Sequence, residues 1–171
     1  MKRAYNVLPI CLVVLGLVSP GCAPDSTTRL EENKAIVRRC MEEVDKGNWA
    51  ILDELLASDY VYYMSGSAEP LTREETEQFA RAVRAAFPDG YATIEDMIAV
   101  GDKVVTRYTF RGTHTADFMG IPATGKKVVG TGICISRIAE GKVAEDREEF
   151  DALHVMMQLG VVPPIGQGAK E

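Results

Sequence analysis

The spacing of apolar residues divides the chain into a helical first half and a strand-rich second half. Apolar side chains recur every three or four positions through residues 30–46, which predicts a helix. Residues 49–56 predict a second short helix, and the aromatic run at 60–64 predicts a strand. Thr72 and Glu75 form a capping-box pattern, which predicts the start of a third helix.

From residue 91 onward the apolar positions alternate with a period of two, which is typical of strands. The alternation predicts four strands, at residues 91–100, 103–112, 127–138 and 142–150. A last helix is expected at residues 151–159. Helices followed by a run of consecutive strands indicate an α+β fold.

The N-terminus has the layout of an export signal. Two basic residues precede an apolar run, residues 4–18, which is too short to span a bilayer comfortably. The next four residues, Ser-Pro-Gly-Cys, resemble a bacterial lipoprotein box in which Cys22 receives lipid. Plain signal cleavage after Ala23 is the alternative. Both interpretations predict export, either as a lipoprotein of the cell envelope or as a secreted or periplasmic protein.

These patterns predict four segments along the chain. They are a signal peptide at 1–22, a linker at 23–29, a folded domain at 30–160 and a flexible tail at 161–171.

The composition is that of a globular domain with no obvious polyanionic partner. The chain has 171 residues, is 46% hydrophobic and carries a formal net charge of -6. It has no cluster of Lys and Arg, so a nucleic-acid partner is not expected. Its Cys and His residues lack the spacing of a metal site, so no metal is expected. Cys40 is expected to be a buried thiol, although a disulfide with Cys134 is possible in an oxidising compartment.

One long segment between two predicted strands stands out. Residues 112–126 place His114 near an apolar tip formed by Phe118 and Met119, with glycines and a proline around it. Long structured loops inside compact domains are uncommon and usually functional. Because neutral-pH proton transfer is typical of histidine, His114 is a candidate for chemistry, although exposed loop histidines are common.

Several short segments, taken in order, resemble the SnoaL-like polyketide cyclases of the NTF2-like superfamily. They are residues 86–89 (Ala-Phe-Pro-Asp), 100–104 (Val-Gly-Asp-Lys-Val), the 112–126 loop, 151–153 (Asp-Ala-Leu) and 158–160 (Gln-Leu-Gly). The resemblance implies a curved antiparallel sheet wrapped around N-terminal helices, with an apolar pocket inside. It also implies a homodimer formed through the sheet, and acid–base ring closure that uses neither a metal nor an organic cofactor.

The resemblance implies a catalytic carboxylate at Asp151 and a pocket arginine at Arg107. Where many family members carry a His-Trp pair, this chain has Asp146 followed by Arg147. Arg147 shares a strand face with Asp151 and is a further candidate. Each has a simpler interpretation: Asp151 as a helix cap, Arg147 as a surface ion pair and Arg107 as an exposed side chain.

Eight residues are candidates for lining the pocket, and the simpler interpretation of most of them is ordinary core packing. They are Trp49, Tyr60, Tyr63, Phe79, Met97, Thr109, Phe118 and Met119. Three functions remain open: an acid–base catalyst acting on a small hydrophobic molecule, a non-catalytic module that binds such a ligand, and a domain that dimerises or docks a partner.

Overall fold

The computed structural model describes residues 26–164. The predicted signal peptide with Cys22 therefore lies outside the described residues, as do residues 165–171. The elements are α1 (Ser26–Asp45), η1 (Trp49–Ile51), α2 (Leu52–Leu55), β1 (Leu56–Met64), β2 (Leu71–Thr72), α3 (Arg73–Ala86), β3 (Tyr91–Val100), β4 (Lys103–Thr113), β5 (Lys127–Ala139), β6 (Lys142–Phe150) and α4 (Ala152–Leu159).

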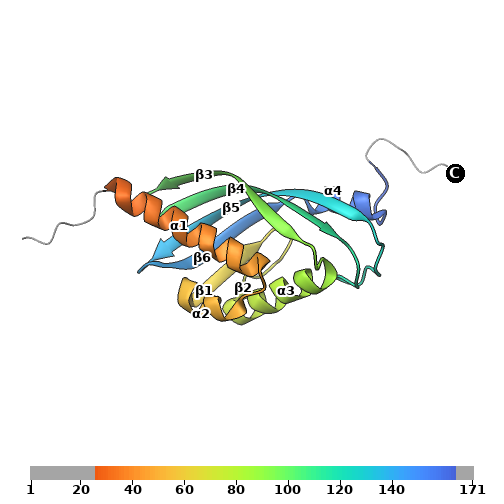
Figure 1. The fold of residues 1–171 in the computed structure, drawn as a ribbon, viewed down its shortest axis with the longest axis horizontal. Coiled ribbons are helices and arrows are strands. Elements are labelled where there is room, and N and C mark those ends of the chain that lie inside the picture. Colours follow the sequence, from red (N-terminus) through yellow and green to blue (C-terminus); the bar gives the residue numbers. More distant parts are fainter. Residues whose placement is uncertain (1–25, 165–171) are drawn as a thin grey trace, which may run out of the picture.

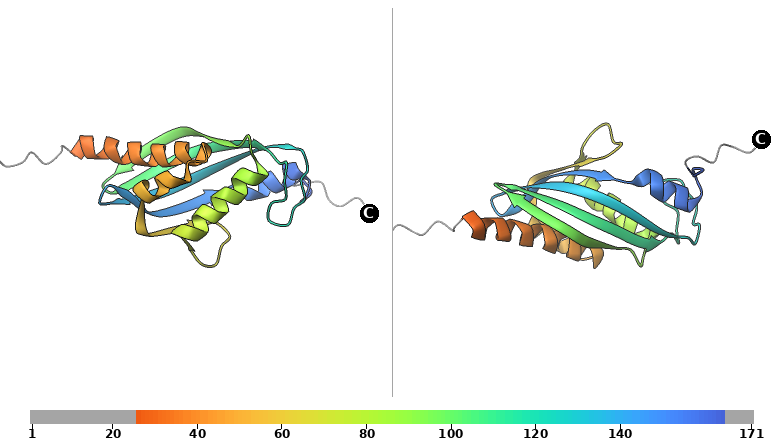
Figure 2. Two further views of the ribbon diagram at one scale, coloured as in Figure 1. Left: turned by 60° about the horizontal axis from the view of Figure 1, so that its bottom comes forward. Right: turned by 90° about the horizontal axis from the view of Figure 1, so that it is seen from above.

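The six strands form one curved sheet in the order β2-β1-β6-β5-β4-β3. Neighbouring strands are antiparallel except for β1 and β6, which run parallel. Helices α1, α2 and α3 lie against one side of the sheet (Figure 1). We call this side the inner face and the opposite side the outer face, on which the strands lie open to view (Figure 2). The predicted α+β fold with a curved sheet is confirmed.

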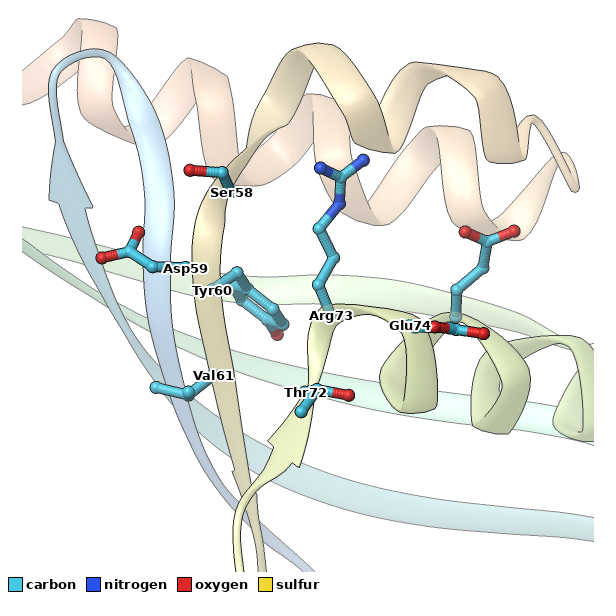
Figure 3. A pocket seen from close by; sticks show the side chains of 8 residues that line it. Ser58, Asp59, Tyr60, Val61, Thr72, Arg73 and Glu74 are labelled. Carbon is cyan, nitrogen blue, oxygen red and sulfur yellow. The ribbon is translucent and has the colours of Figure 1, made fainter.

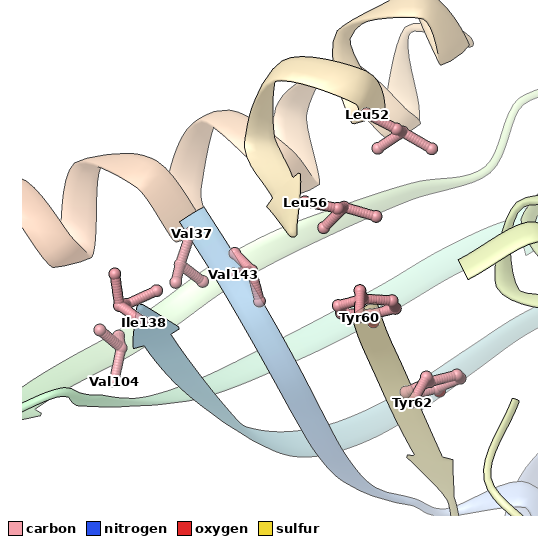
Figure 4. Close-up of a cluster of buried hydrophobic side chains, with 8 residues drawn as sticks. All are labelled: Val37, Leu52, Leu56, Tyr60, Tyr62, Val104, Ile138 and Val143. Carbon is pink, nitrogen blue, oxygen red and sulfur yellow. The ribbon is translucent and has the colours of Figure 1, made fainter. Parts of the chain in front are cut away.

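The main core lies between α1, α2 and the inner face (Figure 4). Its buried residues are Val37, Leu52, Leu56, Tyr60, Tyr62, Val104, Ile138 and Val143. Asn33 on α1 is also buried, and its side-chain amide donates to the Gly101 carbonyl at 3.2 Å. This bond fixes α1 over the turn between β3 and β4.

A bulge in β3 changes which face its apolar side chains occupy. The register with β4 shifts between Ile94 and Asp96. Ile94 is opposite the inner-facing Tyr108, whereas Ile98, beyond the bulge, is 56% exposed on the outer face. One extra residue in a strand reverses the orientation of every following side chain.

Some element boundaries differ from those predicted. Helix α1 begins at Ser26 rather than at residue 30, and β1 begins at Leu56 rather than at residue 60. Strand β2 has two residues, which is too short to show an alternating pattern. The predicted capping box is confirmed, since Thr72 N donates to Glu75 Oε2 at 2.8 Å and Glu75 N donates to Thr72 Oγ1 at 3.3 Å. Within residues 26–164, no helix has both the length and the apolarity to cross a membrane.

Candidate active site

Two carboxyl groups lie on the inner face of β6. Side chains alternate along this strand, so Asp146 and Glu148 point inward while Glu145 and Arg147 point outward. We call Asp146 and Glu148 the carboxyl pair. Both residues are of intermediate exposure, so they line the interior without being sealed from solvent.

Asp146 accepts hydrogen bonds on both carboxylate oxygens. The Tyr60 hydroxyl donates to Oδ2 at 2.8 Å. Oδ1 accepts from the Ser136 hydroxyl and from the Cys134 thiol, whose sulfur is 3.5 Å away. Burial raises the pKa of Asp146 above its ordinary value, and the hydrogen bonds from Ser136, Tyr60 and Cys134 offset part of that rise.

Glu148 is held by two tyrosines from different strands. The Tyr62 hydroxyl donates to one carboxylate oxygen and the Tyr108 hydroxyl donates to the other. Burial raises the pKa of Glu148, the two hydroxyls act in the opposite direction, and the charge of Asp146 raises it further. Burial and the nearby Glu148 also raise the pKa of both tyrosines, so they remain protonated donors.

The carboxyl pair has no cationic partner among residues 26–164, because none of the ion pairs in that range involves Asp146 or Glu148. Carboxyl groups that are desolvated and lack a counter-charge retain protons to higher pH and can serve as acid or base near neutral pH. The arrangement is therefore suited to moving protons to and from a bound molecule.

The thiols next to the pair are free. Cys40 and Cys134 are not joined by a disulfide in the structure. Burial raises the pKa of Cys40 to about 12, with a smaller contribution from Asp146. Cys40 is thus a protonated, largely buried thiol, as its helical register predicts.

A hollow of about 570 Å³ opens between β1 and the start of α3 (Figure 3). Its lining is Ser58, Asp59, Tyr60, Val61, Thr72, Arg73, Glu74 and Glu77. Tyr60 belongs to this lining and also donates to Asp146, so one side chain joins the hollow to the carboxyl pair. Arg73, on the opposite wall, forms an ion pair with Asp53 of α2. Most of the lining residues have polar or charged side chains, although more of the surface that they expose to the hollow is apolar than polar.

The two predicted pocket arginines lie on the outer face. Arg107 is exposed there, as its simpler interpretation predicts. The Arg147 side chain is 54% exposed, donates from Nε to Glu145 Oε1 at 2.7 Å, and lies 3.8 Å from the ring centroid of Tyr63. The expectation that Arg147 and Tyr63 face the interior is therefore wrong. Side chains alternate between the two faces of β6, and because Asp146 points inward, its neighbour Arg147 points outward and meets Tyr63 there.

Thr109 also lies on the outer face, where its hydroxyl donates to Glu95 Oε1 at 2.7 Å. It alternates with Tyr108, which occupies the inner face. Its predicted place in the pocket is therefore wrong for the same reason as that of Arg147.

Asp151 caps the last helix. It precedes α4, and its Oδ1 accepts from the His154 backbone N–H at 3.0 Å. The residue is exposed, so the expectation of an apolar environment around its carboxylate is wrong. The catalytic role implied for Asp151 stays a prediction, and its contacts are those of a cap.

His114 is fully buried rather than exposed at a pocket mouth. Its ring stacks on Phe87 with centroids 5.1 Å apart, and Nδ1 lies 3.2 Å from Thr124 Oγ1. Among the described residues, Nε2 has no hydrogen-bond partner. The histidine therefore joins the two ends of the 112–126 loop, and its role in chemistry stays a prediction.

The remaining pocket candidates are spread around the inner side of the fold. Phe118 packs against Phe79, with ring centroids 6.1 Å apart, whereas Met119 at the loop tip is 74% exposed. Met97 packs against the main core. Trp49 lies beneath the Arg81 guanidinium at 4.7 Å. These residues therefore do not gather in one place around the carboxyl pair.

Sequence reasoning missed most of this site. A usable signal was present, because Asp146 and Glu148 share a strand face with the apolar Ala144 and Phe150. Two carboxylates on the apolar face of a strand are unusual and point to function.

Comparison with known proteins agrees with this geometry. Residues 35–159 match the family described as SnoaL-like polyketide cyclase. The chain is 30% identical over 138 residues to the aklanonic acid methyl ester cyclase DauD of Streptomyces sp. (strain C5), covering 78% of this chain and 84% of that protein.

Solved structures show the same likeness. IdmH, a candidate polyketide cyclase from Streptomyces antibioticus, is 32% identical with a TM-score of 0.68, covering 75% of this chain and 98% of that one. A candidate SnoaL-like polyketide cyclase from a Jannaschia species shares the fold with a TM-score of 0.74 at 22% identity, covering 82% of this chain and 100% of that one. With its family match, its relatives and its NTF2-like fold, the chain belongs to the SnoaL-like polyketide cyclase family.

Proposed function

We propose that this protein catalyses a cyclase- or isomerase-type reaction on a small hydrophobic substrate, with Asp146 and Glu148 as its acid–base pair. Family membership supports the reaction type. The observation that carries the choice of residues is a pair of inner-face carboxyls that have raised pKa values and accept hydrogen bonds from neutral hydroxyl and thiol groups.

Ring closure of a polyketide needs one proton removed and one proton supplied. A base takes a proton from a carbon next to a carbonyl group, and the enolate carbon then bonds to a second carbonyl carbon. An acid donates a proton to the oxygen of that second carbonyl, which becomes a hydroxyl group. The total number of protons on protein and substrate does not change.

The electrostatics suggest how the two roles divide. The charge of Asp146 contributes to the raised pKa of Glu148, so Glu148 holds its proton when Asp146 has lost its own. We assign Asp146 as the base and Glu148 as the acid, with Tyr62 and Tyr108 orienting the Glu148 carboxyl.

The test uses the substrate in the name of a relative, aklanonic acid methyl ester. We expect Asp146→Asn and Glu148→Gln each to lower kcat/KM by about 100-fold or more, the usual loss for a general acid or base. Glu145→Gln is the matched control, because Glu145 neighbours Asp146 but bonds to Arg147 on the outer face. It is expected to leave kcat/KM within about twofold.

Two outcomes would contradict the assignment. If both variants of the carboxyl pair remain active while Asp151→Asn is inactive, the family carboxylate at Asp151 is the catalytic one. If the folded protein binds polyketide esters and turns none over, it is a binding module.

A further inference from the structure

A glycine between two aromatic residues forms one row across the inner face. In this row Tyr108 of β4 is opposite Gly132 of β5, and Gly132 is opposite Phe150 of β6. The middle position has no side chain, and the two flanking rings meet over it. Their centroids are 6.3 Å apart and their planes differ by 12°.

The space above Gly132 is already occupied by Tyr108. A Cβ atom at position 132 would lie 2.5 Å from both Oη and Cζ of Tyr108, much closer than real contacts allow. The backbone of Gly132 is not in the left-handed region, so its conformation does not require glycine. What distinguishes this position is therefore the absent side chain.

We propose that Gly132 is a positioning residue of the candidate site: its missing side chain lets Tyr108 cross β5 and place its hydroxyl on Glu148. The importance of this role for catalysis rests on the proposed function. The hydrogen bond itself does not depend on the proposed function. Tyr108 is on β4 and Glu148 is on β6, so the tyrosine ring must pass over position 132 of β5 to reach the carboxyl group.

The test follows Glu148 directly. The titratable groups facing it are Tyr62, Tyr108, Cys134 and Asp146. Since the bond from Tyr108 lowers the pKa of Glu148, losing it raises that pKa. We expect Gly132→Ala and Tyr108→Phe each to shift the Glu148 pKa upward in a carbon-13 NMR titration. The double variant should shift it no further than Tyr108→Phe alone.

Gly112→Ala is the control on the neighbouring strand β4. A Cβ there would lie 3.1 Å from Phe87 and 3.2 Å from Gly90, and neither residue belongs to the row of Tyr108, Gly132 and Phe150. This variant is expected to lower the free energy of unfolding without moving the Glu148 pKa. If it moves that pKa as much as Gly132→Ala does, general crowding explains the effect and the proposal is wrong.

If Gly132→Ala does not fold in the wild-type protein, the same substitution can be tested in the Tyr108→Leu protein. Tyr108→Leu removes the ring that the new methyl group would strike, so Gly132→Ala should fold in that background and leave the Glu148 pKa at its Tyr108→Leu value. The proposal would be overturned if Gly132→Ala lowered the free energy of unfolding equally in the wild type and in the Tyr108→Leu protein. So would a folded Gly132→Ala protein with an unchanged Glu148 pKa. No substrate is needed, so failure of the proposed reaction gives a separate result.

Discussion

At the residue scale, the carboxyl pair links the stability of the protein to pH. The folded-state pKa of Asp146 is raised, so its contribution to stability is complete below the unfolded pKa, about 4, and is lost as pH rises through the folded pKa. We expect Asp146→Asn to gain stability relative to the wild type between pH 4 and pH 8. The gain is about 1.4 kcal/mol for each unit by which the folded pKa is raised. Urea unfolding at both pH values measures it.

Glu149→Gln on the outer face of the same strand supplies the baseline for that comparison. A difference between Asp146→Asn and wild type that stays constant from pH 4 to pH 8 would show that Asp146 titrates normally in the folded protein.

Asp151 gives a second prediction at this scale. Replacing it with Ala removes the cap on α4, and we expect a loss of about 1 kcal/mol in the free energy of unfolding. Turnover should persist, because its carboxylate bonds to the helix N-terminus and not to the carboxyl pair. Loss of turnover at unchanged stability would restore the catalytic role that the resemblance implies.

The faces of β6 show why the site was only partly predictable. Alternation correctly separates Arg147 from Asp146, but both faces of this strand carry charged residues. With charge on both sides, alternation alone does not say which set points inward, and only the apolar Ala144 and Phe150 favour the face of Asp146. That choice depends on Tyr60 and Tyr62, which lie 86 residues earlier in the chain and are brought to β6 only by the parallel pairing with β1.

At the element scale, the 112–126 loop is a closed structure anchored by backbone and ring contacts. His114 N donates to the Lys126 carbonyl and Gly125 N donates to the His114 carbonyl, at 2.9 and 2.8 Å. Near the tip, Phe118 contacts the rings of Phe79 and Phe87. The sequence indicated a functional loop from its length and glycines, but the burial of His114 depends on packing against Phe87, the residue that follows α3.

Phe118→Ala should loosen this loop. We expect its opening free energy to fall by about 1–3 kcal/mol, because two aromatic contacts are lost. Hydrogen exchange of residues 112–126 reports the change. Met119→Ala is the matched control, since Met119 is 74% exposed, and it should leave exchange unchanged. Equal exchange in the two variants would show that Phe118 does not hold the loop.

Helical elements were the easiest to predict. Helix α3 begins with its capping box and its apolar stripe is long enough to show a period. Strand β2 was not predictable, because only its pairing with β1 makes it a strand. The β3 bulge was not predictable either, because it consists of a single inserted residue.

At the scale of the whole molecule, the outer face of the sheet is the surface on which we place the predicted homodimer. It exposes the large apolar residues Ile98, Val100, Val129, Ile133 and Ile135, and charged side chains surround them. We expect the wild type to sediment as a dimer and Ile98→Glu as a monomer, because a carboxylate at position 98 would be buried in the interface against the apolar Val105 opposite it. Leu153→Glu, also at an exposed position but on α4, should leave the dimer intact. A monomeric wild type would contradict the prediction.

The predicted lipid anchor belongs to the same scale. If Cys22 is lipidated, Cys22→Ala should move the protein from the membrane fraction to the soluble fraction of the producing cell. Mass spectrometry of the mature N-terminus separates this outcome from plain cleavage after Ala23. A wild-type protein found only in the soluble fraction would favour plain cleavage.

The parallel pairing of β1 with β6 also constrains the order in which the molecule can fold. Tyr60 and Tyr62 meet Asp146 and Glu148 across a separation of 86 residues. Contacts this distant in sequence form slowly, because a long loop must close before they contribute stability. The site therefore cannot exist until nearly the whole domain has been synthesised. A nascent chain that stops before β6 holds its tyrosines without their carboxyl partners, and these hydrogen bonds form only after the last strand has joined the sheet.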